Sequence, residues 1–331
     1  MQEFVQEVDI KNDFQKFWNF LDKYINQNEE ISSIYNKSFY AYQKEYCISK
    51  ESYIDEISKI FIKGNVILCG YVFLLNKDKK ITELNFGMDF PGLIFINEDI
   101  DKKNLSKFLI EIEKLKKIDT QIRFTIPRVK TISKSYEEIM NKMNFSHKNI
   151  MTRKIDLCKS KDELWKDIRK SYKSPINKGL REQKFTLLDY KNPREDIFKE
   201  IQNLHYAVAG KVTRSQLTWD LQFSSIKKDN SFAICSYEEK NLTSAVYFLK
   251  SSKHAYYSVG IFTNESKNKL YGYSLIWKSI LYCKKRCISF FEIDHNINFK
   301  STEQNDNKLI QISYFKSGFG GKIYPKHEFI I

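Results

Sequence analysis

The stretch KLIQISYFKSGFGG, residues 308–321, joins a helical pattern to a cluster of glycines. The chain contains only 11 glycines, yet Gly318, Gly320 and Gly321 fall within four positions. Glycine tolerates positive φ and a close backbone approach, so this spacing predicts a turn that presents backbone N–H groups. Lys316, at the end of the helix, would offer a positive charge to an oxygen that becomes negative during a reaction. A lysine before a helix-ending glycine is also simply a favourable charge at a helix C-terminus.

Around this stretch, the second half of the chain alternates helical and strand-like patterns. Helices are expected near 160–170, 174–182, 194–208, 214–228, 269–285 and 306–317, and strands at 184–190, 231–237, 244–250, 254–262, 288–293 and after 317. The first half gives helices at 13–25, 102–117 and 131–143 and strands at 65–75, 81–86, 92–96, 121–126 and 148–157. Both halves place an antiparallel meander before a helix, a strand, another helix and a last strand. This order predicts an α/β (α+β) fold in which each half is a mixed, mostly antiparallel sheet flanked by helices.

The length of 331 residues exceeds what one hydrophobic core usually serves, so two domains are expected, 1–155 and 156–331. A content of 42% hydrophobic and 15% aromatic residues is typical of a globular chain. The N-terminus lacks a basic start and a long apolar core, and no run is long enough to span a bilayer, which favours a cytoplasmic location.

The net charge is 55 − 41 = +14, which favours anionic partners such as phosphates, nucleic acid or an acidic membrane surface. The alternative is a coding bias, because the lysines are spread along the chain and no basic arm occurs. The charge and the 20 tyrosines also support a non-enzymatic reading, an RNA-binding module that stacks bases on aromatic rings.

Several chemistries lack their usual signatures. The six cysteines show no CxxC spacing and fit reduced, buried thiols, and the five histidines show no metal-ligand spacing. No GxSxG, Walker loop or GxGxxG occurs. We therefore expect neither a bound metal nor a bound cofactor.

HYAVAGKVTRSQLTW, residues 205–219, predicts an anion site. Gly210 suits the C-terminal cap of one helix, and Thr213 or Ser215 the N-cap of the next. Arg214 then lies at a helix N-terminus, where backbone donors favour anions, and it could bind a phosphate. The alternative is an ordinary surface arginine in a salt bridge.

The strand patterns YYSVGIF (256–262) and ISFFEIDHN (288–296) supply further candidates. Glu292 and Asp294 follow an aromatic strand, and the end of a strand is a place where open sheets gather ligands. Either carboxylate could act as a base. Alternatively, Glu292 is a structural hydrogen-bond acceptor and Asp294 caps a turn. Tyr257 on the first strand, together with Lys308, Gly318 and Gly320, completes the expected substrate-binding set around Arg214.

The order of these pieces resembles the FemAB-like branch of the GNAT acyltransferase superfamily. The resemblance covers about residues 160–331 and consists of LH ahead of AGKVTR and a Trp, AYYSVG, LIWKSI, FFEI and KLIQISYFKSGFGG. It implies two GNAT-like lobes in tandem and transfer of an acyl or aminoacyl group to an amine of a cell-envelope precursor. Arg214 matches the family arginine that meets nucleotide-sugar phosphates, Lys316 the lysine near the transferred carbonyl, and Glu292 the acidic strand-end position.

The sequence departs from the family pattern at two places. Asp294 stands where the family usually has glycine, and the lysine that helps to bind the nucleotide has no aligned counterpart in residues 33–43, where Lys37 is only nearby. The resemblance thus favours acylation of a nucleotide-linked amino sugar, with a tRNA-dependent peptidoglycan-bridge transferase or an acetyl-CoA-dependent GNAT enzyme as alternatives. Acyl-CoA and aminoacyl-tRNA both remain candidate donors, because no Q/R-x-x-G-x-G/A loop is present. Peripheral membrane association is compatible with either donor. Catalysis as expected here requires Lys316 and Arg214 to face a common cleft.

Overall fold

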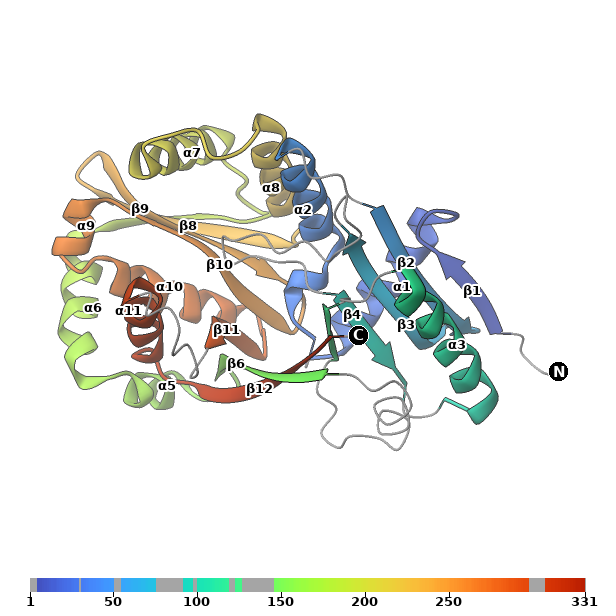
Figure 1. Cartoon of the computed structure of the whole chain (residues 1–331). Helices are drawn as coiled ribbons and strands as arrows, with labels where there is room; N and C mark the ends of the chain where they lie inside the picture. Colours follow the sequence, from blue (N-terminus) through green and yellow to red (C-terminus); the bar gives the residue numbers. More distant parts are fainter. Residues whose placement is uncertain are drawn as a thin grey trace. The chain divides into compact units, whose positions relative to one another are not determined.

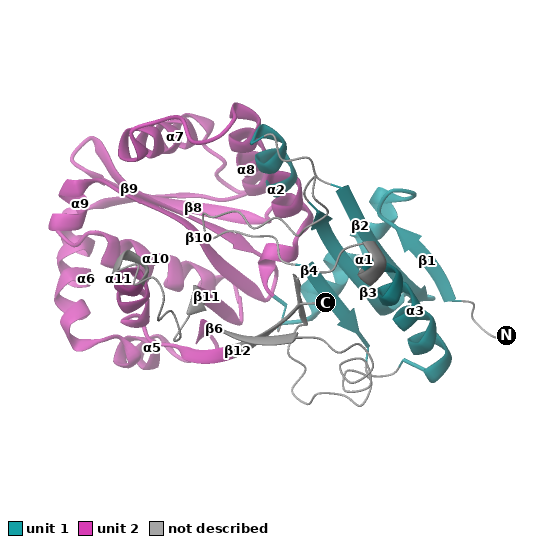
Figure 2. Ribbon diagram, in the orientation of Figure 1, with its two compact units in different colours: residues 1–31, 43–150, 325–331 teal, residues 32–42, 151–324 magenta. Residues whose placement is uncertain are grey.

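The computed structural model describes residues 5–29, 31–50, 55–75, 92–97, 100–118, 123–126, 146–297 and 307–330. The chain divides into two compact units (Figure 2): residues 1–31, 43–150 and 325–331 form unit 1, and residues 32–42 and 151–324 form unit 2. The predicted boundary between 155 and 156 lies five residues after the main division, and each unit also takes a short segment from the other half of the sequence.

Unit 1 contains a sheet in the order β1-β2-β3-β4-β5. Its strands are β1 (Val5–Asp9), β2 (Asp55–Lys63), β3 (Val66–Leu75), β4 (Gly92–Ile96) and β5 (Arg123–Ile126). All neighbours pair antiparallel except β4 and β5, which are parallel. The end of β12 (Lys322–Ile330) pairs antiparallel with β5 through residues 327–330. Every residue of β3 after Val66 is buried, as expected for a strand covered on both faces.

Two helices of unit 1 confirm their periodic patterns. In α1 (Phe14–Gln27), Phe17, Trp18, Leu21 and Ile25 are buried, and the Asp13 carboxylate caps the helix by accepting a hydrogen bond from the Lys16 N–H at 2.9 Å. The second helix, α3 (Lys102–Ile118), packs Phe108 and Ile112 into the core under β3. The predicted strand 81–86 and helix 131–143 lie outside the described residues.

Unit 2 is built on the strand order β6-β11-β10-β9-β8-β7. These strands are β6 (Ser146–Asp156), β7 (Lys184–Leu188), β8 (Ser231–Glu238), β9 (Asn241–Lys250), β10 (His254–Phe262) and β11 (Phe290–Ile297). The pair β10 and β11 is parallel and the other pairs are antiparallel. The sheet is therefore mixed and mostly antiparallel, as predicted.

Helices cover both faces of this sheet (Figure 1). On one face lie α7 (Glu195–Ala209) and α8 (Gln216–Lys227), and on the other α5 (Lys161–Asp167), α6 (Lys170–Glu182), α10 (Gly272–Lys285) and α11 (Asn307–Ser317). A short helix, α9 (Asn264–Asn268), follows β10. A hydrophobic core of unit 2 lies under α6 and α10, where Phe232, Phe248 and Phe291 pack against Leu275 and Ile276.

The parallel pair β10–β11 separates part of the way along. Pairing covers only His254–Tyr256 opposite Phe290–Glu292, although β10 continues to Phe262 and β11 to Ile297. A bulge in β10 between Tyr257 and Val259 accompanies the separation. We call this place the strand fork. Tyr257 is the first residue of β10 beyond the last β10–β11 pair.

Residues 32–42 belong to unit 2 although they come early in the sequence. They contain the 3-10 helix η1 (Ser33–Tyr35) and the beginning of α2 (Lys37–Ser49). Ile34, Tyr35, Phe39 and Tyr40 are all at most 3% exposed. The Ser33 hydroxyl donates to the Leu249 carbonyl at 3.2 Å, and the Asn230 amide donates to the Ser38 hydroxyl at 2.9 Å. We call residues 32–42 the N-terminal strap of unit 2.

Candidate functional site

Lys316 and Tyr257 lie together at the strand fork. The Lys316 ammonium is 5.3 Å from the centre of the Tyr257 ring, within cation–π range. Helix α11 carries Lys316 in its last turn, and β10 carries Tyr257 just beyond the fork. Burial raises the pKa of the Tyr257 phenol, so this side chain stays protonated and neutral at physiological pH. The structure thus brings together two residues that the sequence placed in the site.

The glycine turn after α11 uses its N–H groups internally. The N–H groups of Gly318, Phe319 and Gly320 donate to the carbonyls of Phe315, Lys316 and Ser317, at 3.2 to 3.3 Å. The expectation that this turn presents these N–H groups to a ligand is therefore wrong, because they satisfy the last carbonyls of the helix. Gly320 and Gly321 have φ of +86° and +83°, which only glycine adopts at little cost.

Gly318 is required by packing. A Cβ at this position would lie 2.0 Å from the Tyr172 ring. The Tyr172 hydroxyl donates to the carbonyls of Tyr314 and Phe315, and the Arg169 N–H donates to the Gly318 carbonyl at 2.9 Å. These contacts fix the end of α11 on the start of α6, and so they position Lys316. The sequence pattern gave no signal for this role of Tyr172, because the contact joins segments about 140 residues apart.

Arg214 is buried between aromatic side chains. It is 7% exposed, its guanidinium carbon lies 3.6 Å from the centre of the Trp219 ring, and its Nη1 donates to the Tyr42 hydroxyl at 2.7 Å. The Ser215 hydroxyl caps α8, and Gly210 ends α7 with a left-handed φ of 69°, as the sequence predicted. Tyr42 comes from the N-terminal strap, and sequence reasoning missed it because no local pattern joins positions 172 residues apart.

The charge of Arg214 has no acidic partner within the part of the chain that the structure describes. No carboxylate there lies within 4.0 Å of its guanidinium, and its buried Nε has no hydrogen-bond partner. Burying a charge without a counter-charge is costly. Nearby, burial and then the positive charge of Arg214 lower the pKa of His205 to about 4, so this imidazole is neutral at pH 7. Arg214 is therefore not the surface arginine in a salt bridge that the sequence left as the alternative.

Glu292 lies in a buried polar cluster. It is 2% exposed, and its two oxygens accept hydrogen bonds from the Thr152 hydroxyl at 2.6 Å and from the Ser32 hydroxyl at 2.9 Å. The His254 Nε2 is 3.1 Å from Glu292 Oε2 but does not align as a hydrogen bond, while His254 Nδ1 accepts from the Ser33 N–H at 3.2 Å. These contacts fit the alternative considered from the sequence, in which Glu292 is a structural hydrogen-bond acceptor.

Two further candidates have only their backbone described. Asp294 lies in β11, opposite Arg153 of β6, and Lys308 lies in the first turn of α11. Their side chains lie outside the described residues.

The two cations lie on opposite faces of the sheet of unit 2. On β9, the Tyr247 hydroxyl donates to the Gln222 carbonyl of α8, whereas the next residue, Phe248, packs against Tyr257 in the core under α10. Adjacent residues of a strand point to opposite faces. Helices α8 and α10 lie on opposite faces of the sheet (Figure 1). Arg214, which packs on Trp219 of α8, therefore belongs to one face, and Lys316, which packs on Tyr257, belongs to the other. The expectation that Lys316 and Arg214 face one open cleft is therefore wrong, and a substrate that contacts both cations would have to reach both faces of the sheet.

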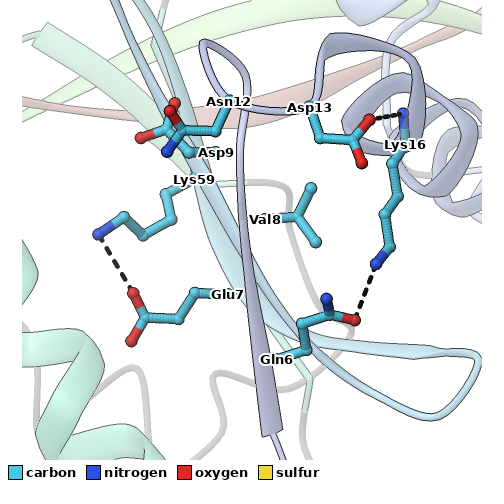
Figure 3. A pocket seen from close by; sticks show the side chains of 8 residues that line it. All are labelled: Gln6, Glu7, Val8, Asp9, Asn12, Asp13, Lys16 and Lys59. Atoms are coloured by element: carbon cyan, nitrogen blue, oxygen red, sulfur yellow. Dashed lines mark hydrogen bonds and ion pairs between the residues drawn. The ribbon is translucent and has the colours of Figure 1, made fainter.

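A cavity of about 180 Å³ lies in unit 1, beside β1 (Figure 3). Asp9 and Asp13, in its lining, already accept from the N–H groups of Lys11 and Lys16, and Lys59 pairs with Glu7 at 3.4 Å. These polar groups serve local structure. Within the described ranges, no group of three or more His, Cys, Asp or Glu side chains could hold a metal ion.

Comparison with solved structures identifies the architecture. FemX superposes with a TM-score of 0.64, with 14% identity over 98% of this chain and 96% of that chain. This chain has the fold of FemX. The same FemX-type fold occurs in the C-terminal domain assigned to a lysylphosphatidylglycerol synthetase from Agrobacterium fabrum, with a TM-score of 0.56 and 10% identity over 95% of this chain and 91% of that chain.

A tandem GNAT protein from the clavulanic acid biosynthesis pathway also shares the architecture, with a TM-score of 0.51 and 10% identity over 99% of this chain and 98% of that chain. No protein-family model and no curated protein matches the sequence. The chain thus has a FemX-type fold with two GNAT-like lobes in tandem, as the sequence resemblance implied.

Proposed function

We propose that this chain is an N-acyltransferase that acylates an amine on a phosphate-bearing acceptor, such as a nucleotide-linked amino sugar. The observation that carries the proposal is Arg214, a buried guanidinium with no carboxylate partner in the described residues, held in a FemX-type fold. A phosphate would supply the missing counter-charge, and the planar fork of arginine matches phosphate geometry.

The second part of the proposal concerns the reacting carbonyl. The amine of the acceptor attacks the carbonyl carbon of a thioester or ester, a C–N bond forms, and the carbonyl oxygen becomes an oxyanion. The C–S or C–O bond to the carrier then breaks, and the leaving group takes the proton that the amine loses. Lys316 at the strand fork supports this step, because a positioned cation stabilises the oxyanion.

The donor is proposed to be acyl-CoA or aminoacyl-tRNA, and the product decides between them. The purified chain is incubated with each donor and a nucleotide-linked amino sugar, and the acceptor is followed by mass spectrometry. An increase by one acyl or aminoacyl group is expected with one donor. If the acceptor stays unmodified with both donors across amino-sugar and muropeptide acceptors, the proposal is wrong.

Lys316→Ala tests the assigned oxyanion role. Losing one such donor typically costs about 3 kcal/mol in the barrier, so turnover should fall about 100-fold or more while the affinity for the acceptor changes little. Lys322→Ala, at an exposed lysine of the same charge six residues on, is the matched control. Full turnover by the Lys316→Ala protein would remove this lysine from the mechanism.

A further inference from the structure

The connection between α7 and α8 is exposed and apolar. Residues 207–212, AVAGKV, are exposed without interruption, with Val208 at 43% and Val212 at 70%. Leu217, in the first turn of α8, is 51% exposed. We call residues 207–212 together with Leu217 the α7–α8 tip. Soluble surfaces rarely gather aliphatic side chains in this way without a partner.

The space around the tip is open. Gly210, at its centre, has a φ of +69°, and a Cβ added there would meet no atom within 4 Å. The two helices behind the tip hold it firmly, because the Gln202 amide of α7 donates to the Gln216 side chain of α8 at 2.7 Å. The apolar side chains are thus displayed on a fixed support.

Lys211 is the one charged residue of the tip itself, and the exposed carboxylate of Asp220 lies one helical turn beyond Leu217. No Asp or Glu occurs between Glu200 and Asp220, and the only exposed cation in this interval is Lys211, since Arg214 is buried. The chain as a whole carries +14. Aliphatic side chains beside a lysine complement a lipid surface, which has an apolar interior beneath anionic headgroups.

We propose that the α7–α8 tip docks on an anionic phospholipid bilayer, with Val208, Val212 and Leu217 at the acyl boundary and Lys211 among the headgroups. Nucleic acid fits less well, because it is bound by several cations and by stacked aromatic rings, and the tip offers one lysine and aliphatic side chains. A second copy of the chain also fits less well, since a stable interface buries roughly 800 Å² per partner, far more than three aliphatic side chains supply. This docking goes beyond the acyl transfer proposed above and does not depend on it.

Co-sedimentation of the full chain with vesicles tests the docking. Binding is expected to vesicles that contain phosphatidylglycerol and to be at least about 10-fold weaker with phosphatidylcholine alone. Val212→Asp combined with Leu217→Asp should weaken binding to the anionic vesicles about 10-fold or more. The matched control is Ile48→Asp combined with Ile110→Asp, the same change at two exposed aliphatic residues of 50% and 54% exposure in unit 1.

The charge is tested separately. Lys211→Glu should weaken binding to anionic vesicles, whereas Lys240→Glu, at an exposed lysine of the β8–β9 turn, should not. Arg214→Ala removes the proposed acceptor site and should leave vesicle binding unchanged, so that failure of docking and failure of the proposed function can be told apart. Absence of wild-type binding, equal binding by the tip variant and its control, or loss of binding to competing tRNA would each overturn the proposal.

Discussion

Arg214 and His205 are neighbours whose charges oppose each other. Part of the lowering of the His205 pKa to about 4 comes from the Arg214 charge. An anion bound to Arg214 should cancel this charge and raise the His205 pKa. An NMR titration of the imidazole protons with and without inorganic pyrophosphate, at matched ionic strength in chloride, measures the shift. If Arg214→Gln responds to pyrophosphate as the wild type does, the anion does not bind at this arginine.

His205 also predicts how stability depends on pH. Its pKa is lower in the folded chain than the ordinary value of 6.5, so the unfolded chain binds more protons between about pH 6.5 and pH 4. The folded state should therefore lose stability as the pH falls through this range, by about 1 kcal/mol after allowance for solvent screening of a partly exposed group. Urea denaturation of the wild type and of His205→Gln at pH 7 and pH 4.5 gives the difference. An equal loss in both proteins would exclude His205 as the cause.

Glu292→Gln separates a structural role from a catalytic one. The buried carboxylate accepts from Thr152 and Ser32, and an amide has only one oxygen to accept with. The free energy of unfolding should fall by about 1 to 3 kcal/mol, while turnover of the folded protein stays within about tenfold. Thermal unfolding and a rate measurement on the same sample decide. An intact fold with turnover reduced more than 1000-fold would instead make Glu292 the base.

At the scale of elements, Gly318→Ala tests how the end of α11 is held. The new methyl group would lie 2.0 Å from the Tyr172 ring, so α11 or Tyr172 must move. We expect a loss of about 2 kcal/mol in stability and a lower turnover, because Lys316 moves with the helix. Gly210→Ala is the control, since its Cβ meets no atom and only the left-handed φ opposes it. If the two variants lose the same stability and Gly318→Ala retains full turnover, packing at Gly318 does not position Lys316.

The sequence predicted elements with a strong local signal and missed those without one. The strands β8, β9 and β10 and the capped helices α1 and α8 lie close to the ranges predicted for them. Strand β2 was missed, because DEISKIFIK is polar at its start and its pairing with β3 decides its structure. The strand fork could not be predicted from the sequence either, because its position depends on where β10 and β11, which are 30 or more residues apart, stop pairing.

For the candidate site, the sequence supplied the cations but not their surroundings. Arg214 and Lys316 were found from helix ends and from the family resemblance. The contacts that hold them, Tyr42 and Tyr172, come from distant segments and carry no local pattern. The same distance effect explains why the two cations were expected on one face, although they occupy two.

At the scale of the whole molecule, the N-terminal strap makes unit 2 discontinuous. Without residues 32–42, three buried hydrogen bonds are lost. These are the bond from the Ser32 hydroxyl to Glu292, the bond from the Ser33 N–H to His254, and the bond from Arg214 to the Tyr42 hydroxyl. A fragment of residues 151–324 is therefore expected to lack cooperative thermal unfolding, and a synthetic peptide of residues 31–43 should restore it. Calorimetry of the fragment with and without the peptide measures this. Cooperative unfolding of the fragment alone would show that the strap is dispensable.

The strap also sets an order of events during translation. Residues 32–42 leave the ribosome about 250 residues before Glu292, a delay of roughly 10 to 50 s at 5 to 20 residues per second. During that time Ile34, Tyr35, Phe39 and Tyr40 lack the strands that later bury them. The nascent chain must keep these side chains from aggregating, so its yield in a cell should depend on chaperones that bind early-emerging apolar segments.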